Sequence, residues 1–301
     1  MNFEDQIISF KPKPLIDDPI KMESLLRKAN DVDIKRPKLN DFNDVYSSDE
    51  IKRDELLIQK RKDEWKEQNS DYEKFVRDFS SIYEASVIDL LDTNKFLGED
   101  TEVIPTSKYD DIFNGIDGVF IINQKKNISN YLGLNMDVTY SSGEINIDKK
   151  IDSIKQCIRE GELPTLKYFQ DPKTKEHKKI SLPKIIIGSQ QSSADGLIRL
   201  WGQTTKDNSE KLKNHPIQSK IIMEALSQLM YFYKFAKNLA ENTRENKMRE
   251  KYENITLKYG QMYNYFLDIY HSKKDLIESH YNEIMSDSVY KEIIAITEGK
   301  K

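Results

Sequence analysis

The sequence predicts an α/β protein in which a small mixed sheet is flanked by helices, with a helical arm before it and a helical region after it. Three observations give this expectation. Two short apolar runs, residues 115–122 and 132–139, are separated by a polar segment and indicate a β-hairpin. The continuous apolar run at residues 185–187 is typical of a central strand covered on both faces. After Pro216, apolar residues recur at intervals of three or four, which indicates long helices.

These elements divide the chain into three parts. Residues 1–70 are expected to form an extended arm, with only a brief helical segment, followed by a charged and mostly solvated helix that begins at a capping box at residues 47–50. Residues 71–202 are expected to form the α/β core, and residues 203–301 the helical C-terminal region. Pro216 fits the first turn of a helix in this last part.

The core begins with an amphipathic helix over residues 71–91, which is expected to pack against the sheet because its apolar positions gather on one side. The other core elements are shorter than this helix. In chain order they are a strand near 102–104, the hairpin, a helix over 148–160, a strand at 165–169, a turn at 171–174, a strand at 182–188 and a helix ending at Trp201.

Composition and charge limit the classes of function. The chain has 301 residues, 37% of them hydrophobic, which is enough for a substantial core. The formal net charge is −4, so the overall charge does not indicate nucleic-acid binding, although a local basic face remains compatible with it. Cys157 is the only cysteine, which excludes intrachain disulfides and cysteine-rich zinc sites.

The absence of several sequence motifs limits the classes of function further. The sequence has no apolar run near 18 residues, and the first 19 residues contain acids and prolines where a signal peptide would be apolar, so we expect a cytoplasmic protein without a membrane partner. Glycine-rich phosphate loops, the Gly-x-Ser-x-Gly elbow and the His-Glu-x-x-His pair are also absent from the sequence.

Asp117 and Asp137 are acids within the two otherwise apolar runs of the hairpin. Their midpoint, residue 127, lies in the polar segment where the chain would turn, so the two acids are expected to face each other. Directly opposed residues on antiparallel strands have Cβ atoms about 4.5 to 5.5 Å apart, where two carboxylates repel. A shared Mg²⁺ or Mn²⁺ ion would compensate. In the alternative, one acid caps a strand and the other faces solvent or an arginine.

Lys150 and Glu84 are the further candidates for this site. Lys150 borders the apolar stripe of the helix that follows the hairpin, whereas Lys149 points away, so Lys150 is the cation expected beside the acids. Glu84 lies on the preceding amphipathic helix, where it would complete the metal shell. The alternatives are a lysine whose head group lies in solvent and a solvated helix carboxylate.

The order of these residues resembles the PD-(D/E)XK nuclease superfamily over residues 71–191. That superfamily has a restriction-endonuclease-like core of a helix, a strand meander, a second helix and a further strand. It has an acid near the start of one strand, an acid on the next strand, a lysine two residues later, and often a Glu on the preceding helix. Asp117, Asp137 and Glu84 match the three acids.

Two positions depart from the superfamily pattern. Thr139 stands where the lysine is expected, and Ile116, which precedes the first acid, is not a proline. Lys150 matches the position of a lysine that has moved to the following helix in parts of the superfamily.

The resemblance implies metal-dependent hydrolysis of phosphodiester bonds in DNA or RNA, by an endonuclease or an exonuclease. Asp117 and Asp137 would hold Mg²⁺, with Mn²⁺ as a substitute, and Lys150 would stabilise the developing charge or orient the attacking water. A member of the superfamily that no longer cleaves would carry much the same residues. The second hypothesis is therefore a scaffold that binds a protein or nucleic-acid partner, with the helical regions as its contact surfaces.

A run of basic residues beside the proposed core is the candidate contact for a nucleic-acid backbone. Its members are Lys173, Lys175, His177, Lys178, Lys179 and Lys184. Gln190 and Gln191 follow the apolar strand, where they would contact substrate or a metal-bound water. The alternatives are a solvated, lysine-rich hairpin and a polar turn.

Overall fold

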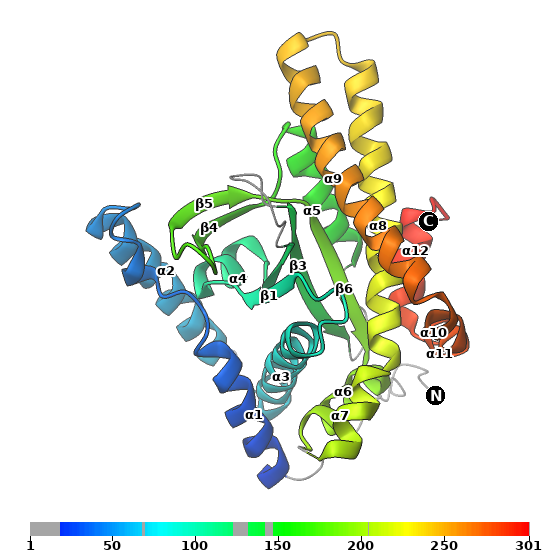
Figure 1. Ribbon diagram of the computed structural model, residues 1–301. Helices are drawn as coiled ribbons and strands as arrows, with labels where there is room; N and C mark the ends of the chain where they lie inside the picture. Colours follow the sequence, from blue (N-terminus) through cyan, green and yellow to red (C-terminus); the bar gives the residue numbers. More distant parts are fainter. Residues whose placement is uncertain (1–18, 68–69, 123–131, 142–146, 204, 301) are drawn as a thin grey trace, which may run out of the picture.

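The sheet at the centre of the protein has four strands and is mixed (Figure 1). The structure is a computed structural model that describes residues 19–67, 70–122, 132–141, 147–203 and 205–300. The strands, in spatial order, are β1 (Thr101–Pro105), β2 (Gly118–Ile122), β3 (Leu132–Ser141) and β6 (Lys184–Gln190). The first three are antiparallel neighbours, and β6 runs parallel to β3. The expected α/β class with a small mixed sheet is confirmed.

The register of the hairpin is the one that the sequence predicts. Gly118 pairs with Met136, so the same register, extended by one residue, places Asp117 opposite Asp137. The Asp117 N–H donates to the Met136 carbonyl at 2.9 Å, which joins Asp117 to β3 just before β2 begins. The turn itself was expected within residues 124–130, which lie outside the described residues.

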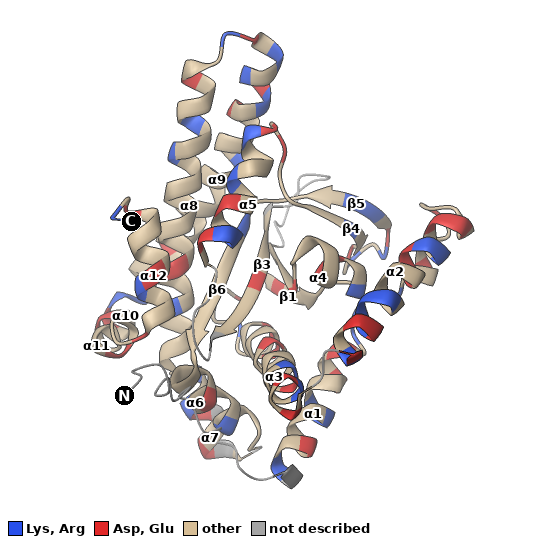
Figure 2. Ribbon diagram, turned by 180° about the vertical axis from the view of Figure 1, so that it is seen from behind, with Lys and Arg blue, Asp and Glu red and all other residues tan. Residues whose placement is uncertain are grey.

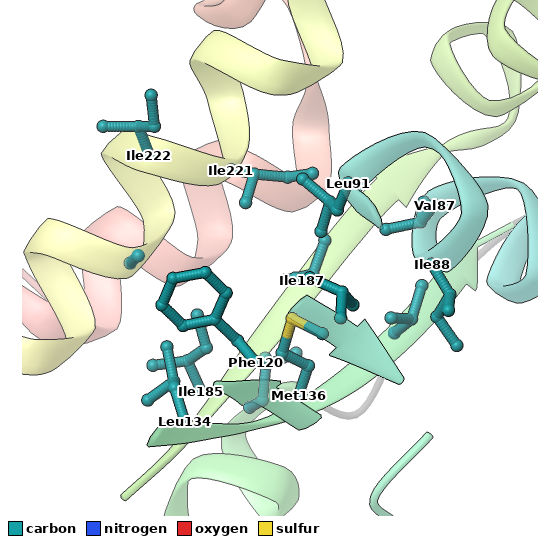
Figure 3. Packing of buried hydrophobic residues seen from close by; sticks show 14 of the residues in the cluster. Val87, Ile88, Leu91, Phe120, Leu134, Met136, Ile185, Ile187, Ile221 and Ile222 are labelled. Carbon is teal, nitrogen blue, oxygen red and sulfur yellow. The ribbon is translucent and has the colours of Figure 1, made fainter. Parts of the chain in front are cut away.

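The helix α3 (Asp71–Thr93) covers one face of the sheet. Ser70 and Glu73 form a complete capping box at its first turn, which satisfies backbone N–H groups that the helix leaves unpaired. Figure 3 shows apolar side chains of α3, the sheet and the later helix α8 meeting in one interior; those labelled include Val87, Leu91, Phe120, Met136, Ile187 and Ile221. Burial of each such side chain stabilises the fold by roughly 1.5 to 3 kcal/mol.

The N-terminal arm is folded over its described part, which corrects the expectation of an extended segment. It contains α1 (Pro19–Asp33) and a short 3₁₀ helix, η1 (Leu39–Phe42). The side chains of Leu25, Ala29 and Val32 are buried in the same cluster as α3. Their spacing of four and three residues is that of one helix face, so packing on α3 stabilises a segment whose propensity alone is weak.

The charged helix α2 (Ser48–Glu67) is mostly solvated, as predicted. Only half of the expected capping box forms: the Ser47 hydroxyl accepts from the Glu50 N–H at 3.3 Å. The Glu50 carboxylate instead pairs with Lys167 at 2.8 Å, so α2 is tied to the strand β4 (Thr165–Gln170).

A short helix, α4 (Lys108–Asn114), lies between the strand expected near residues 102–104 and the hairpin, where the sequence analysis placed no helix. Gly115 ends it with φ of 57°, a left-handed conformation that favours glycine. The buried Asp110 accepts hydrogen bonds from the backbone N–H groups of Lys167 at 2.7 Å and Tyr168 at 3.0 Å. These bonds hold α4 against β4, which pairs with β5 (His177–Ser181) in a separate two-stranded sheet.

Helices make up the remainder of the described chain. They are α5 (Ile147–Arg159), α6 (Gln191–Trp201), α7 (Lys206–Lys213), α8 (Pro216–Asn242), α9 (Asn246–Ser272), α10 (Lys274–Ser279), α11 (Tyr281–Ile284) and α12 (Ser288–Thr297). Pro216 begins α8 at the first helical turn, as predicted. The helices α8 and α9 form a long hairpin whose tip projects from the body (Figure 1). No helix within the described ranges is both long and apolar enough to cross a membrane.

The strand β6 lies at an edge of the sheet, although its apolar run predicts a central position. Its residues are buried because α8 covers the edge with polar side chains one turn apart. Gln228 accepts from the Ile186 N–H at 2.9 Å and donates to the Ile186 carbonyl at 2.7 Å. Glu224 accepts from the Gly188 N–H at 3.3 Å, and Lys220 donates to the Gly188 carbonyl. These side chains take the place of a neighbouring strand.

One cluster of buried apolar side chains joins the three parts predicted from the sequence. It contains residues of α1, α3, the sheet, α5, α8 and α9. The helical C-terminal region therefore packs directly on the sheet that carries Asp117 and Asp137.

Candidate metal centre

Asp117 and Asp137 open onto one cavity of about 430 Å³, at the end of the hairpin where β2 begins. Glu84 of α3 and Lys150 of α5 line the same cavity. The structure thus brings together the four residues that the sequence singles out for catalysis, from four different elements. Lys184, at the start of β6, is a fifth charged residue in this cavity.

A backbone N–H of the neighbouring strand β3 orients the Asp117 carboxylate. Its Oδ2 accepts a hydrogen bond from the Val138 N–H at 2.6 Å, and the residue is 6% exposed. Gly115, just before it, leaves room for the site, because a Cβ added there would lie 3.2 Å from the Lys184 Nζ and 3.5 Å from the Asp137 Oδ2. The glycine that ends α4 therefore also permits the close approach of the charged groups.

Asp137 lies between two ammonium groups. The Lys150 Nζ contacts its Oδ1 at 2.6 Å, and the Lys184 Nζ contacts its Oδ2 at 3.2 Å. Lys184 also donates to the Asn114 carbonyl at 3.1 Å. The choice of Lys150 over Lys149 agrees with this geometry, since Lys149 is exposed.

Lys184 is the site residue that the sequence interpretation placed elsewhere, in the basic run. Its position depends on the parallel pairing of β3 with β6, which sets Lys184 beside Asn135. Asn135 and Asp137 share a face of β3, because side chains alternate along a strand. The sequence shows a lysine directly before a continuously apolar strand. It does not show which strand will pair with that one, because the partner lies far away in the sequence.

The cavity has an excess of acidic groups. Burial raises the pKa of Glu84 well above its ordinary value, and the carboxylates of Asp117 and Asp111 add to this shift. Burial likewise raises the pKa of Asp117, with further repulsion from Asp111 and Asp137. Desolvation is the largest single influence on Lys150 and lowers its pKa, but the charge and hydrogen bond of Asp137, together with the charges of Asp117 and Glu84, outweigh it, and the net shift is upward. A divalent cation would relieve the repulsion among these carboxylates.

Asp111 is an acid that the sequence interpretation did not select. It lies on α4, lines the cavity, and pairs with Arg36 at 3.3 Å and with Lys108 at 3.3 Å. Both cations also pair with Asp33 of α1. The folded arm therefore supplies part of the charge balance around the cavity.

The donor set suits a hard cation that keeps much of its water. No group of three or more His, Cys, Asp or Glu side chains in the described part of the chain has the arrangement of a preformed metal site. Mg²⁺, however, is usually bound by only one or two carboxylates, together with waters and substrate phosphates. Asp117 and Asp137 can provide these two carboxylates, and Glu84 lies in the same cavity.

The other predicted contacts lie away from the cavity. Gln190 is the residue before α6, where its side chain donates to the Ser192 hydroxyl at 2.9 Å and accepts from the Ser288 N–H at 3.0 Å. It thus joins α6 to α12 and does not line the cavity. This placement corrects the expectation that Gln190 contacts substrate or a metal-bound water there.

Apart from Lys184, the predicted basic run lies on the β4–β5 hairpin and the turn before β5 (Figure 2). Lys178 pairs with Glu176 at 3.1 Å and lies 3.8 Å from Asp171. Three further members of the run are exposed: Lys173, Lys175 and Lys179. None of these four lysines lines the cavity at Asp117. Their contact with nucleic acid stays a prediction that is separate from the chemistry of the site.

Comparisons with protein-family models, with curated proteins and with solved structures found no match to this chain. The function is therefore argued from the arrangement of the elements and the side chains of the cavity.

Proposed function

We propose that this protein is a metal-dependent nuclease of the PD-(D/E)XK type, which hydrolyses phosphodiester bonds of DNA or RNA. The observation that carries the proposal is the juxtaposition of Asp117, Asp137 and Lys150 in one cavity. Apart from the inserted helix α4 and the β4–β5 hairpin, the order of elements supports it: a helix, three antiparallel strands, a second helix and a strand parallel to the third. This is the order that the superfamily resemblance leads us to expect.

The two aspartates would hold the cation. When bound, Mg²⁺ or Mn²⁺ would supply Lewis-acid stabilisation of the phosphate and a more acidic water. Asp117 lines the cavity, and the Val138 N–H orients its carboxylate. Asp137 is oriented by the ammonium groups of Lys150 and Lys184. These contacts orient both carboxylates before a ligand arrives, and a bound cation would replace one of the two lysines at Asp137.

The lysines and Glu84 have distinct roles in this proposal. Lys150 and Lys184 place two positive charges beside the scissile phosphate, where negative charge develops during hydrolysis. Lys184 thereby provides from β6 a charge that Thr139 does not provide from β3. Glu84, whose pKa is raised by burial and neighbouring acids, orients the attacking water and can exchange a proton with it.

The second candidate is a nucleic-acid-binding protein that retains this fold without cleaving. The specific observation in its favour is that both oxygens of Asp137 are already paired, one with each lysine. Such pairing neutralises a metal ligand, and displacement of one lysine by the cation is required for activity.

Cleavage of labelled DNA and RNA in the presence of Mg²⁺ or Mn²⁺ separates the two candidates. We expect the wild type to cleave and Asp137→Asn to lose at least about 100-fold in rate. Asp152→Asn is the matched control, because Asp152 is an exposed acid on α5 that pairs only with Lys155 at 2.9 Å among the described residues. It should retain the wild-type rate. Cleavage that survives in Asp137→Asn would contradict the proposed site, and binding without cleavage by the wild type would favour the second candidate.

A further inference from the structure

A second cavity, of about 510 Å³, adjoins the candidate metal centre. The two cavities share four lining residues: Ser80, Glu84, Asp111 and Ile112. From there the second cavity follows α3 back toward its first turn and reaches the last turns of α2. The two cavities are therefore sections of one groove, which leads from the tip of α2 to Asp117 and Asp137.

We propose that this groove holds a single-stranded nucleic acid and guides it to the candidate metal centre. The inference rests on the proposed nuclease function, since it names the form of nucleic acid that the same site receives. Three features of the groove carry it: aromatic side chains at its far end, cations beside them, and its continuity with the carboxylates.

Trp65 and Tyr72 line the far end of the groove. Trp65 lies seven residues after Ile58, which in turn lies seven residues after Ile51, so it continues the apolar stripe of α2. Ile51 is 1% exposed and Ile58 is 8% exposed, whereas Trp65 is 38% exposed. The stripe thus runs past the core and presents an indole to the groove. Every nucleobase has a flat face that can stack on such a ring.

The cations at this end are Lys62 of α2 and Arg77 of α3. They lie beside the aromatic residues, as phosphate contacts do along a bound strand. Glu73 also lines this cavity, but its carboxylate is engaged at the first turn of α3, where it accepts from the Ser70 N–H at 2.8 Å. Figure 2 shows both blue and red bands along α2, so these cations belong to a helix of mixed charge.

The aromatic side chains and the cations at the far end of the groove together favour a single strand over a duplex. A base can stack on Trp65 or Tyr72 only when its face is free, and the bases within a duplex are already stacked on their neighbours. At the other end of the groove, Lys150 and Lys184 of the candidate metal centre contact the phosphate backbone of the bound strand. A strand bound in this way contacts cations at both ends of the groove.

Binding is best measured without cleavage, by fluorescence anisotropy of labelled oligonucleotides of about 12 nucleotides in EDTA. The probes are single-stranded DNA, RNA of the same sequence, and the duplex. We expect the full-length protein to bind at least one single strand more tightly than the duplex. Trp65→Ala should weaken that binding about 5- to 100-fold, the range for loss of one stacked base. The double variant Lys62→Gln/Arg77→Gln should reduce the slope of log affinity against log salt by about 1.4.

The matched controls are Leu56→Ala and Lys60→Gln. Leu56 is an exposed apolar residue of α2, 71% exposed, and Lys60 is an exposed lysine of the same helix; neither lines the groove. Both variants should bind as the wild type does. The thermal unfolding of each variant is measured beside its binding, and Leu56→Ala and Lys60→Gln, whose side chains are exposed, should unfold as the wild type does.

The inference is overturned if no single strand binds, if Trp65→Ala binds like the wild type, or if the duplex binds as tightly and is affected equally. These outcomes are distinct from failure of the nuclease proposal. Metal-dependent cleavage that is insensitive to Trp65→Ala would contradict the proposed role of the groove and would still support the nuclease proposal. Single-strand binding that depends on Trp65, without any cleavage, would support the proposed role of the groove and contradict the nuclease proposal.

Discussion

Replacement of Asp117 by asparagine should stabilise the protein while it removes metal binding. The side chain is buried beside other acids, and burial together with Asp111 and Asp137 raises its pKa. Asparagine has the same shape, and its carbonyl oxygen can still accept the hydrogen bond from the Val138 N–H. The substitution therefore removes the charge and keeps the local geometry.

The size of the effect follows from the position of the two aspartates. Opposed carboxylates about 5 Å apart repel by about 3 kcal/mol at an effective dielectric constant of about 20. Lys150 and Lys184 compensate Asp137, so we expect Asp117→Asn to gain about 1 to 3 kcal/mol. For a chain of this size the gain corresponds to an increase in Tm of about 2 to 6 °C.

The pH dependence of this gain has a definite sign. The folded-state pKa of Asp117 lies above its ordinary value of 3.8, so the wild type loses stability as the pH rises from 3.8 through the folded-state pKa. The advantage of Asp117→Asn should therefore be largest above that pKa and should disappear near about pH 4.

Differential scanning fluorimetry with and without Mg²⁺ or Mn²⁺ measures both effects. Metal at about 100 times its Kd should stabilise the wild type by about 2.7 kcal/mol and leave Asp117→Asn unchanged. Asp54→Asn is the matched control, because Asp54 is 2% exposed but pairs with Lys167 and accepts from the Tyr168 hydroxyl at 2.8 Å. It should lower stability by about 3 kcal/mol and keep the response to metal. A destabilised Asp117→Asn, or one that still responds to metal, would refute the reasoning.

Three further substitutions test the fold around the site. Burial raises the pKa of Glu224 to about 8, so the wild type should lose stability as the pH rises from about 4.5 to about 8. Glu224→Gln should therefore gain in Tm relative to the wild type over that range. An equal difference in Tm between the two proteins, measured by calorimetry at about pH 6 and about pH 9, would contradict this. Gln228→Leu leaves the N–H and carbonyl of Ile186 without their side-chain partner and should cost about 2 to 4 kcal/mol in urea unfolding, with a cost below about 0.5 kcal/mol arguing against edge capping. Ser70→Ala removes the cap of α3 and should lower the unfolding free energy by about 1 kcal/mol, whereas no change in urea unfolding would mean that the cap contributes nothing.

The hairpin and the choice of lysine were predictable because both depend on local sequence. The polar segment around residue 127, midway between the two acids, predicts the register of the two apolar runs, and this register places Asp117 opposite Asp137. Helical periodicity distinguishes Lys150 from its neighbour Lys149, since only one of them borders the buried stripe. Their roles in catalysis stay predictions until activity is measured.

The parts that sequence reasoning missed depend on contacts between distant segments. The position of β6 at an edge is stabilised by Gln228 and Glu224, which lie about 40 residues later on a helix and would ordinarily be assigned to its solvated face. Lys184 enters the site only because β6 pairs with β3. The arm folds because Leu25 and its neighbours pack on α3, an interaction that the composition of residues 1–46 does not reveal.

Anomalous diffraction from crystals of the protein soaked in Mn²⁺ would locate the cation on which the proposed nuclease depends. We expect a peak in the cavity with carboxylate oxygens of both Asp117 and Asp137 at about 2.0 to 2.6 Å, and at least one of Lys150 and Lys184 moved away from Asp137. The absence of a peak there, with both lysines still paired to Asp137, would contradict the proposed metal centre.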